Sequence, residues 1–232
     1  YRQPESGTFA VFTGRYHRQD YVVEKYFISG EGSYPIPFLL LIPNLNQKHP
    51  IVIYLSPQGK NAAAAIGQEM EWLVNKGYAV IAPDLIGTGE MGPGDFTGDA
   101  YNFKLGKVSY NIWFAYLLLG RSIVGLQAGD LSRIINYLYS RDDIDKNKIL
   151  GLARAEMCPT LLHAAAFDHR ISKVALIEPL LSYQEIVMNR YYKPQFIPLT
   201  VAGALTTYDL PDLAASLAPR ELLIVNALDH TG

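Results

Sequence analysis

The sequence predicts an α/β domain in which a mostly parallel, twisted sheet carries helices on both faces. Three observations support this fold class. Short, continuously apolar runs rich in β-branched residues recur along the chain, as is typical of strands buried on both faces. Longer segments with apolar residues at helical spacing separate these runs, and such alternation implies a parallel sheet. The 232 residues fit one large domain or two small ones, and they can bury enough surface to fold without disulfides or metal ions.

An antiparallel hairpin is predicted at the start of the domain. Its two strands cover residues 21–30 and 35–44. Residues 1–20 are assigned to an N-terminal extension. Residues 21–232 are assigned to a single domain, which is either a whole unit, a fragment or one half of a longer protein.

Two buried strands and a helix between them follow the hairpin. PIVIYLS (50–56) is a continuous β-branched run that ends in PQGK, and YAVIAPD (78–84) is a second strand of this kind. The helix places four apolar residues at helical spacing: Ile66, Met70, Leu73 and Val74. Gly77 stands where a helix commonly ends.

The second half of the chain continues the alternation. A glycine-rich loop leads into YNFKLGKVSYNIWFAY (101–116), which is interpreted either as a lid segment or as a helix packed on the sheet. The remaining elements are, in order, a helix at about 123–139, a strand at 148–153, a helix at 157–168 and strands at 173–179 and 220–229.

Several polar or small residues follow the predicted parallel strands. Right-handed crossovers place every strand-to-helix loop at the same edge of the sheet, and ligands of such sheets bind outside the carboxyl ends of the strands. The residues at those ends are Ser56, Asp84, Ala155, Glu178 and Asp229.

The composition argues against some classes of partner. The net charge is −2 with acidic and basic residues well mixed, so no basic stripe is available for nucleic acid. The longest apolar run, residues 112–120, is about half of what a membrane span needs. The single cysteine cannot form an internal disulfide. We expect no nucleic acid partner, no membrane span and no cofactor.

The order of these motifs resembles the α/β-hydrolase superfamily. The hairpin is followed by IVIYLSPQGK, YAVIAPDLIGTGE, a strand–turn–helix unit and LAPRELLIVNALD. The stretch GLQAGDLSRIINYLYSRDDIDKNKI and the later LLHAAAFDHRI are similar to the acetyl xylan esterase-like branch of bacteria. The resemblance runs from about Tyr16 to the last residue. It implies an α/β-hydrolase fold whose last strand is absent from the sequence, a carbohydrate ester as ligand, and a secreted or periplasmic location.

In this family a serine nucleophile stands on a strained strand-to-helix turn with the pattern G-x-S-x-G. Here that turn falls on Ala153, Arg154, Ala155, Glu156 and Met157, so all three diagnostic positions differ. A methyl group has no lone pair with which to attack a carbonyl. A single engineered substitution would leave the two glycines in place, so we interpret the elbow as naturally degenerate and the protein as a pseudo-esterase.

The resemblance also implies roles for other residues. Asp229 matches the position of the catalytic acid, whereas the histidine is expected one strand later, beyond Gly232. His230 is the candidate base in its place. The backbone N–H groups of Glu156 and Gln58 match the oxyanion donors.

Further residues at this edge have competing interpretations. Arg154, Glu178 and Asp84 are candidate ligand-binding residues. Cys158, at the helix start, is either a reactive thiol or a small buried residue at the helix–sheet contact. His163 is interpreted as a core or helix-surface residue.

Three functions remain open from the sequence. The first is a non-catalytic hydrolase-like domain that binds a ligand or partner, including a second hydrolase domain in a longer chain. The second is an active carboxylester hydrolase that deacetylates carbohydrate esters with an engineered or noncanonical nucleophile. The third uses the carboxylates Glu156, Glu178, Asp229, Asp84 and Glu90 for metal binding or acid–base chemistry.

Overall fold

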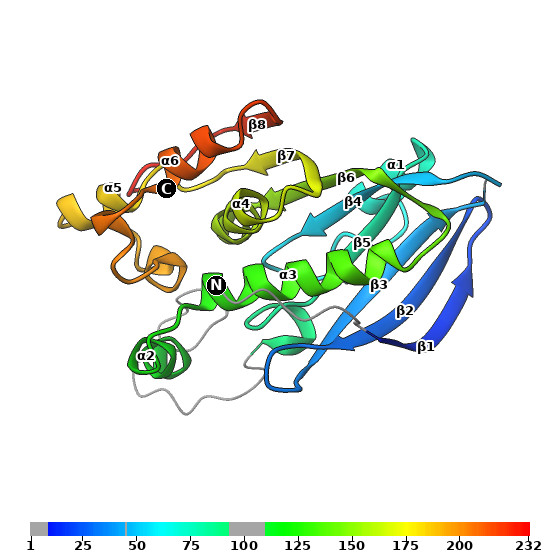
Figure 1. Ribbon diagram of the computed structural model, residues 1–232, viewed down its shortest axis with the longest axis horizontal. Helices are drawn as coiled ribbons and strands as arrows, with labels where there is room; N and C mark the ends of the chain where they lie inside the picture. The colour runs from blue at the N-terminus through cyan, green and yellow to red at the C-terminus, as the bar shows by residue number, and fades with distance from the viewer. Residues whose placement is uncertain (1–8, 45, 93–109) are drawn as a thin grey trace.

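Eight strands form one mixed sheet in the computed structural model, which describes residues 9–44, 46–92 and 110–232. The strands are β1 (Ala10–His17), β2 (Tyr21–Ser29), β3 (Pro35–Pro43), β4 (His49–Leu55), β5 (Ala79–Pro83), β6 (Ile144–Arg154), β7 (Ile171–Ile177) and β8 (Glu221–Val225). They lie side by side in the order β1-β2-β3-β5-β4-β6-β7-β8 (Figure 1). The pairs among β5, β4, β6, β7 and β8 are parallel, and β1 to β3 pair antiparallel. The predicted α/β class with an N-terminal hairpin is confirmed.

Helices cover both faces of the sheet (Figure 1). The α-helices are α1 (Glu69–Asn75), α2 (Tyr110–Leu118), α3 (Ile123–Tyr139), α4 (Cys158–Phe167), α5 (Tyr183–Met188) and α6 (Leu210–Ser216). Short 3-10 helices are η1 (Gly89–Met91), η2 (Ala155–Met157), η3 (Pro194–Leu199) and η4 (Ala204–Thr206). Buried residues of α3, α4 and α6 share one apolar core, and those of α1 share a second core on the opposite face.

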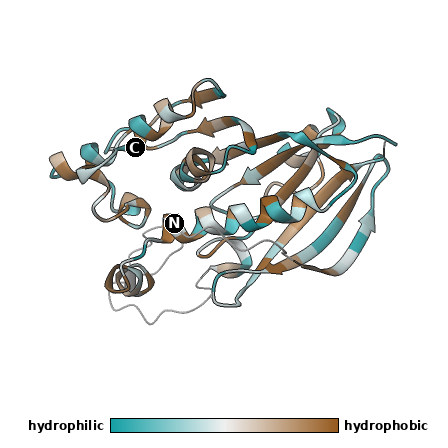
Figure 2. Ribbon diagram, viewed as in Figure 1, coloured by the Kyte–Doolittle hydropathy of each residue, from teal (hydrophilic) through white to brown (hydrophobic). Residues whose placement is uncertain are grey.

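Successive side chains of the central strands belong alternately to these two cores. In β4, Ile51, Ile53 and Leu55 belong to the core under α3 and α4, whereas Val52 and Tyr54 belong to the core under α1. Successive side chains of a strand point to opposite faces, so a strand buried on both sides must be apolar throughout. Figure 2 shows this as hydrophobic colour along the central strands.

Part of the predicted N-terminal extension belongs to the sheet. Residues 10–17 form β1, which pairs with β2 around a bulge between Phe12 and Gly14. Most of its side chains are exposed, so the strand lacks the apolar pattern that identifies the others. Backbone pairing holds it, together with an ion pair between Arg15 and the buried Glu24.

The helix after β4 is shorter than the apolar spacing predicts. Met70, Leu73 and Val74 are buried on α1 as expected, but Ile66 is 66% exposed and lies before the helix. Gly67 has a φ of +78°, a left-handed conformation that interrupts a helix at this point. The prediction for α3, at residues 123–139, agrees with its observed bounds.

The segment interpreted as a lid or a packed helix is described only in its second part. Residues 93–109 lie outside the described ranges, and residues 110–118 form α2. This helix lies beyond the carboxyl ends of the strands, to one side of the sheet (Figure 1), and Leu118 is 88% exposed. Within the described residues no single helix is both long and apolar enough to cross a membrane; only residues 112–118 and 123–139 taken together reach that limit, as two segments bent by 89°.

A buried carboxyl group joins the hairpin turn to α3. Tyr34, in the turn between β2 and β3, donates its hydroxyl hydrogen bond to Asp130 Oδ2, and Asp130 is completely buried. The nearest cation, Arg133, places Nε 3.8 Å from Asp130 Oδ1. Burial raises the pKa of Asp130 to about 7, and the hydrogen bond from Tyr34 opposes this shift only in part.

This carboxyl group makes stability dependent on pH. The native carboxyl holds its proton up to about pH 7, whereas an unfolded aspartate loses it near pH 3.9. The free energy of unfolding should therefore fall as pH rises through this window. Asp130→Asn should reduce this dependence of the free energy of unfolding on pH. The same substitution at the exposed Asp142 should leave the dependence unchanged. Urea unfolding at pH 4.5, 5.5 and 6.5 measures both slopes, and an unchanged slope in Asp130→Asn would contradict the assignment.

Candidate functional site

The carboxyl ends of β4 to β8 meet at one edge, as the topology requires. Ala155 lies at this edge, in the turn between β6 and α4, and its φ is +46°. A left-handed backbone costs a residue with a β-carbon about 1–2 kcal/mol, so the turn is strained. A sharp strand-to-helix turn of this kind lifts its apex residue out of the sheet. The chain therefore keeps the backbone of an elbow with a methyl group at the apex.

The residues that follow two further strands also have a left-handed backbone conformation. Glu178 follows β7 with a φ of +57°, and Asn226 follows β8 with a φ of +51°. Asparagine tolerates the left-handed region better than most residues, which is a sequence signal for Asn226 that our prediction did not use. Strained residues tend to cluster at functional sites, and here they mark the ends of three neighbouring strands.

The residues that replace the family's glycines are part of the core. Ala153 and Met157 are both buried among the apolar residues on the α4 side of the sheet. Cys158 follows, and its thiol lies 3.3 Å from the Ala153 carbonyl oxygen and 3.4 Å from that of Ile177. Burial raises the pKa of this thiol to about 12, so it stays protonated. Cys158 is a packing residue rather than a nucleophile.

The Arg154 side chain is held by α1, which lies on the face of the sheet opposite α4. Its Nε and Nη2 donate to the two carboxylate oxygens of Glu69 on α1, over 3.0 and 2.8 Å. The Tyr54 hydroxyl donates to Glu69 Oε2 over 2.6 Å. Burial acts to raise the pKa of Glu69, but the hydrogen bonds from Arg154 and Tyr54 outweigh it and hold the pKa below its usual range. Arg154 is thus fixed in place, with part of its side chain still exposed.

Asp84 is the centre of a buried charge network. Its Oδ1 accepts from the Lys60 backbone N–H over 2.7 Å, and its Oδ2 accepts from Lys60 Nζ over 2.5 Å and from the Glu90 N–H over 2.9 Å. Lys60 Nζ also donates to Glu90 Oε1 over 2.7 Å. Asp84 is completely buried. It therefore joins the loops after β4 and β5 and has no surface exposed to solvent, and its role as a ligand-binding residue stays a prediction.

Two glycines let these loops close on the carboxylate. A β-carbon at Gly59 would lie 2.6 Å from Asp84 Oδ1, and one at Gly89 would lie 2.2 Å from the same atom. Both glycines also have positive φ, at +81° and +48°. The glycine-rich composition of this loop thus serves the packing around Asp84.

Gln58, one of the two predicted oxyanion donors, already has a hydrogen-bond partner. Leu55 pairs with Ala153 in the sheet, so the loop after β4 and the elbow lie next to each other. The Gln58 backbone N–H, however, donates to Ser56 Oγ over 3.3 Å, and the Ser56 hydroxyl donates to Gln58 Oε1 over 2.6 Å. An oxyanion could bind this N–H only in competition with Ser56.

The acid and base candidates are held apart by different partners. Asp229 Oδ1 accepts from the Thr231 N–H over 2.7 Å and from its hydroxyl over 2.6 Å, and these hydrogen bonds lower the pKa of Asp229. His230 Nδ1 instead lies 2.9 Å from Glu185 Oε2, on α5. Across the described residues no hydrogen bond joins His230 to Asp229, or either of them to Ala155. Asp229 is thus bound within its own loop, whereas His230 contacts α5.

The other histidines do not reach the elbow. His17 and His49 lie at the opposite edge of the sheet, at the end of β1 and the start of β4, and His169 precedes β7 there. His163 is buried in α4, with Nδ1 2.7 Å from the Pro159 carbonyl oxygen and Nε2 3.1 Å from the Tyr208 hydroxyl. Burial lowers the pKa of His163, so it is neutral at pH 7, in agreement with its interpretation as a core residue.

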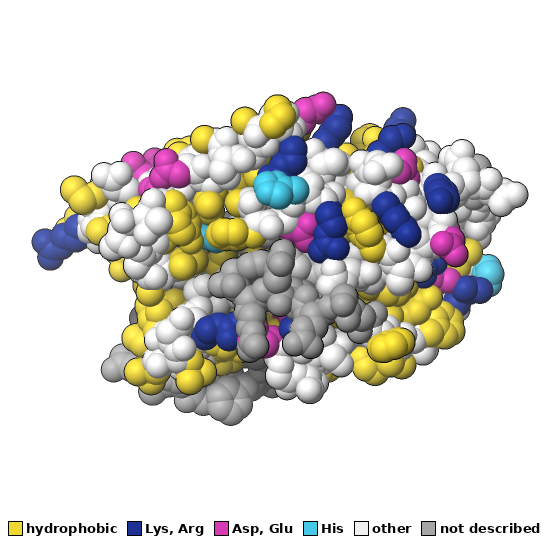
Figure 3. All heavy atoms as spheres, viewed as in Figure 1, with side chains coloured by type: hydrophobic (Ala, Val, Ile, Leu, Met, Phe, Trp, Pro, Cys, Tyr) yellow, Lys and Arg dark blue, Asp and Glu magenta, His cyan; other side chains and the backbone are white. Residues whose placement is uncertain are grey.

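The surroundings of the elbow combine acidic and apolar side chains. Glu156 and Glu178 both lie close enough to Cys158 for their charges to raise the pKa of its thiol, after the larger effect of burial. Farther out, apolar side chains of α2 and α5 gather at this end of the molecule (Figure 3); among them Phe114, Val187 and Met188 are exposed. In the described ranges no three His, Cys, Asp or Glu side chains are placed to hold a metal ion.

Comparison with known proteins supports the fold. A presumed acetyl xylan esterase of Bacteroides fragilis NCTC 9343 superposes with a TM-score of 0.77 at 21% identity, over 97% of this chain and 63% of that one. An acetyl xylan esterase from Paenibacillus sp. R4 gives 0.67 at 14% identity, covering 99% and 85% of the two chains. A glucuronoyl esterase from Solibacter usitatus gives 0.63 at 14% identity, covering 97% and 69%. No family model and no curated protein matches the sequence. The chain has the α/β-hydrolase fold, which confirms the predicted resemblance at the level of fold.

The buried charge network should contribute strongly to stability. Lys60→Met leaves the Asp84 carboxylate buried without a cation, and we expect a loss of about 3–5 kcal/mol in the free energy of unfolding. Glu90→Gln removes only the exposed partner and should cost about 1 kcal/mol or less. Urea unfolding of both variants tests this difference. Equal losses would show that Lys60 and Asp84 are not the centre of the network.

Because the backbone at Ala155 is strained, substitution by glycine should have opposite effects on stability at Ala155 and at Ala153. Ala155→Gly removes the left-handed penalty and should raise the free energy of unfolding by about 0.5–1 kcal/mol after the entropy cost of glycine. Ala153→Gly removes a buried methyl from an ordinary strand position and should lower it by about 1 kcal/mol or more. Thermal and urea unfolding of the pair measure the signs. A loss at position 155 comparable to that at 153 would refute the strain.

Proposed function

We propose that this chain is an acetyl xylan esterase-like domain that binds a carbohydrate ester, or a related small molecule, without hydrolysing it. The observation that carries this proposal is Ala155 at the apex of a strained elbow. Hydrolases of this fold attack the ester carbonyl from a hydroxyl at that position, and a methyl group cannot form the acyl-enzyme bond.

The surroundings of the apex support the same conclusion. General-base catalysis needs an imidazole within hydrogen-bond reach of the nucleophile, and His230 is bound to Glu185 instead. A developing oxyanion would meet the carboxylates of Glu156 and Glu178 near the elbow, and the Gln58 N–H is engaged by Ser56. Each of these arrangements disfavours the charge that ester hydrolysis builds up.

The ligand class and the partner are proposed from likeness to other proteins. The solved structures described above are named as esterases of xylan acetyl groups and of glucuronoyl esters, and the chain covers only about 63% of the first of them. We therefore propose a carbohydrate ester as the ligand. A second hydrolase domain in a longer protein is the proposed partner.

One observation also fits a second candidate function. The backbone strain of the elbow persists although no side-chain chemistry at position 155 requires it. An active carboxylester hydrolase in which a serine had been replaced would keep this turn. The two candidates differ in what a restored hydroxyl would do.

Restoring the hydroxyl separates these candidates. We expect the unmodified protein to give no turnover of p-nitrophenyl acetate above background. Ala155→Ser should remain within about tenfold of it, because a serine without an aligned base lacks most of the catalytic advantage of a triad. Ala155→Gly serves as the matched control for the elbow. Turnover of Ala155→Ser at a thousand times the background would instead establish the active hydrolase.

Binding is tested without relying on turnover. The unmodified protein should give saturable chemical-shift changes with acetylated xylo-oligosaccharides and release no acetate over the titration. Unacetylated oligosaccharides of the same length are the control for recognition of the ester. If neither the acetylated nor the unacetylated oligosaccharide bound saturably, the binding function would be refuted. The question of hydrolysis would still be answered by the serine variant.

A further inference from the structure

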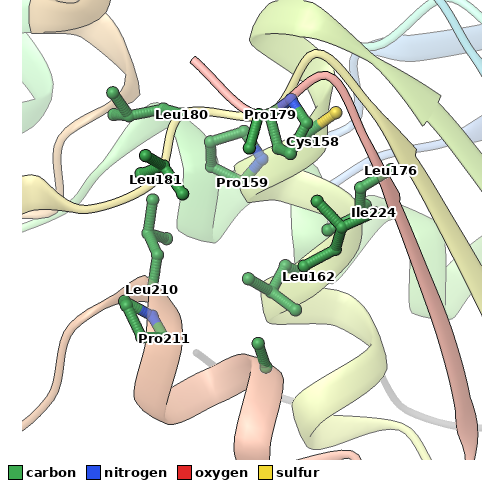
Figure 4. Close-up of a pocket in the computed structure, with 12 residues that line it drawn as sticks. Cys158, Pro159, Leu162, Leu176, Pro179, Leu180, Leu181, Leu210, Pro211 and Ile224 are labelled. Carbon is green, nitrogen blue, oxygen red and sulfur yellow. The ribbon is translucent and has the colours of Figure 1, made fainter. Parts of the chain in front are cut away.

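An apolar pocket of about 200 Å³ lies beside the elbow helix, on the face of the sheet that carries α4 and α6. Figure 4 shows Leu162 of α4, Leu176 of β7 and Ile224 of β8 on one side of the space, and Leu181 and Leu210 on the other. Ala155 is not among the lining residues. The pocket is therefore separate from the apex at which an ester would be attacked.

Hydrogen bonds fix the segments that form the walls of this pocket. The Leu228 N–H donates to the Pro179 carbonyl over 2.8 Å, and the Leu181 N–H donates to the Leu228 carbonyl over 2.9 Å, so the loops after β7 and β8 support each other. Asp209 Oδ1 accepts from the Tyr183 N–H over 2.7 Å and from the Leu210 N–H over 2.6 Å. This carboxylate fixes the start of α5 against the start of α6. These hydrogen bonds hold the loops after β7 and β8, and the starts of α5 and α6, in their relative positions.

The side chains of the lining favour an apolar ligand. All twelve lining residues carry apolar side chains except Cys158, whose thiol is already directed at the carbonyl oxygens of Ala153 and Ile177. A hydroxyl, amide or charged group packed against these side chains would lose water without gaining a side-chain partner. Leu181 and Ile224 are each 47% exposed, so an apolar ligand would also cover side chains that now face water.

We propose that this pocket binds an uncharged aromatic or short aliphatic group of about ten non-hydrogen atoms or fewer. An apolar cavity of about 150 Å³ stays dry and accepts benzene, so this somewhat larger and partly open space suits a substituted ring. The class of ligand differs from the carbohydrate proposed for the elbow. The two proposals are independent, because this one requires neither ester hydrolysis nor sugar binding.

Toluene and erythritol, a polyol only one non-hydrogen atom larger, make a matched pair of probes. Toluene should bind saturably with a Kd of about 1 mM or tighter, and the chemical shifts of the Leu162 and Ile224 methyl groups should report it. Erythritol should leave these methyl signals unchanged. Saturable toluene binding at these two residues supports the proposal, whereas no binding, or equal shifts from erythritol, would overturn it.

Filling the pocket tests its location. Ala214 of α6 lines the pocket and Ala215 of the same helix is exposed, so the two positions form a matched pair. Ala214→Phe should raise the Kd for toluene at least tenfold, and Ala215→Phe should change it less than twofold. Ala227→Leu, at the other wall, provides a second blocking variant if Ala214→Phe does not fold. Toluene binding that survives in the folded blocking variants would refute the assignment.

Discussion

The buried pair of Lys60 and Asp84 sets the geometry of the carboxyl edge on which the candidate site depends. It joins the loop after β4 to the end of β5, and a carboxylate without water must have its charge neutralised nearby. The order extends from there: the Gln127 side-chain amide of α3 donates to the Ile86 carbonyl over 2.7 Å and accepts from the Thr160 hydroxyl over 2.5 Å. Thr160 lies in the first turn of the elbow helix, so the network reaches α4.

A frame supported in this way can hold a strained turn regardless of the residue at its apex. Left-handed backbone persists only where the surroundings determine the path of the chain, and β6 is paired on both sides before it reaches Ala155. The backbone of the elbow and its chemistry are therefore separable. The first is maintained by the sheet, by the buried Met157 and by α4, whereas the second needs a hydroxyl and an imidazole that the described geometry does not bring together.

The edge of the sheet and the space beside α4 offer different environments. At the elbow, Arg154, Glu156 and Glu178 provide charge and partial exposure to water. On the other side of the α4 start, the pocket has an almost entirely apolar lining and hydrogen-bonded walls. A single short helix thus lies between a charged edge of the sheet and a pocket lined by apolar side chains. The carbohydrate ester and the hydrophobic group that we propose as ligands would therefore meet different sides of this helix.

Hydrophobic period and turn residues determined the fold class by themselves, because strands buried on both faces must be apolar throughout and α3 carries its stripe over its full length. They also placed Ala155 in a strand-to-helix turn, which is where the structure has it. β1 and the role of Asp84 required the tertiary structure: β1 is held by backbone pairing that leaves no apolar pattern, and Asp84 is buried by a lysine and two glycines from other parts of the chain. The contact of His230 also required the tertiary structure, because its partner Glu185 lies on α5, far from it in the sequence, whereas Asp229 is bound by the nearby Thr231.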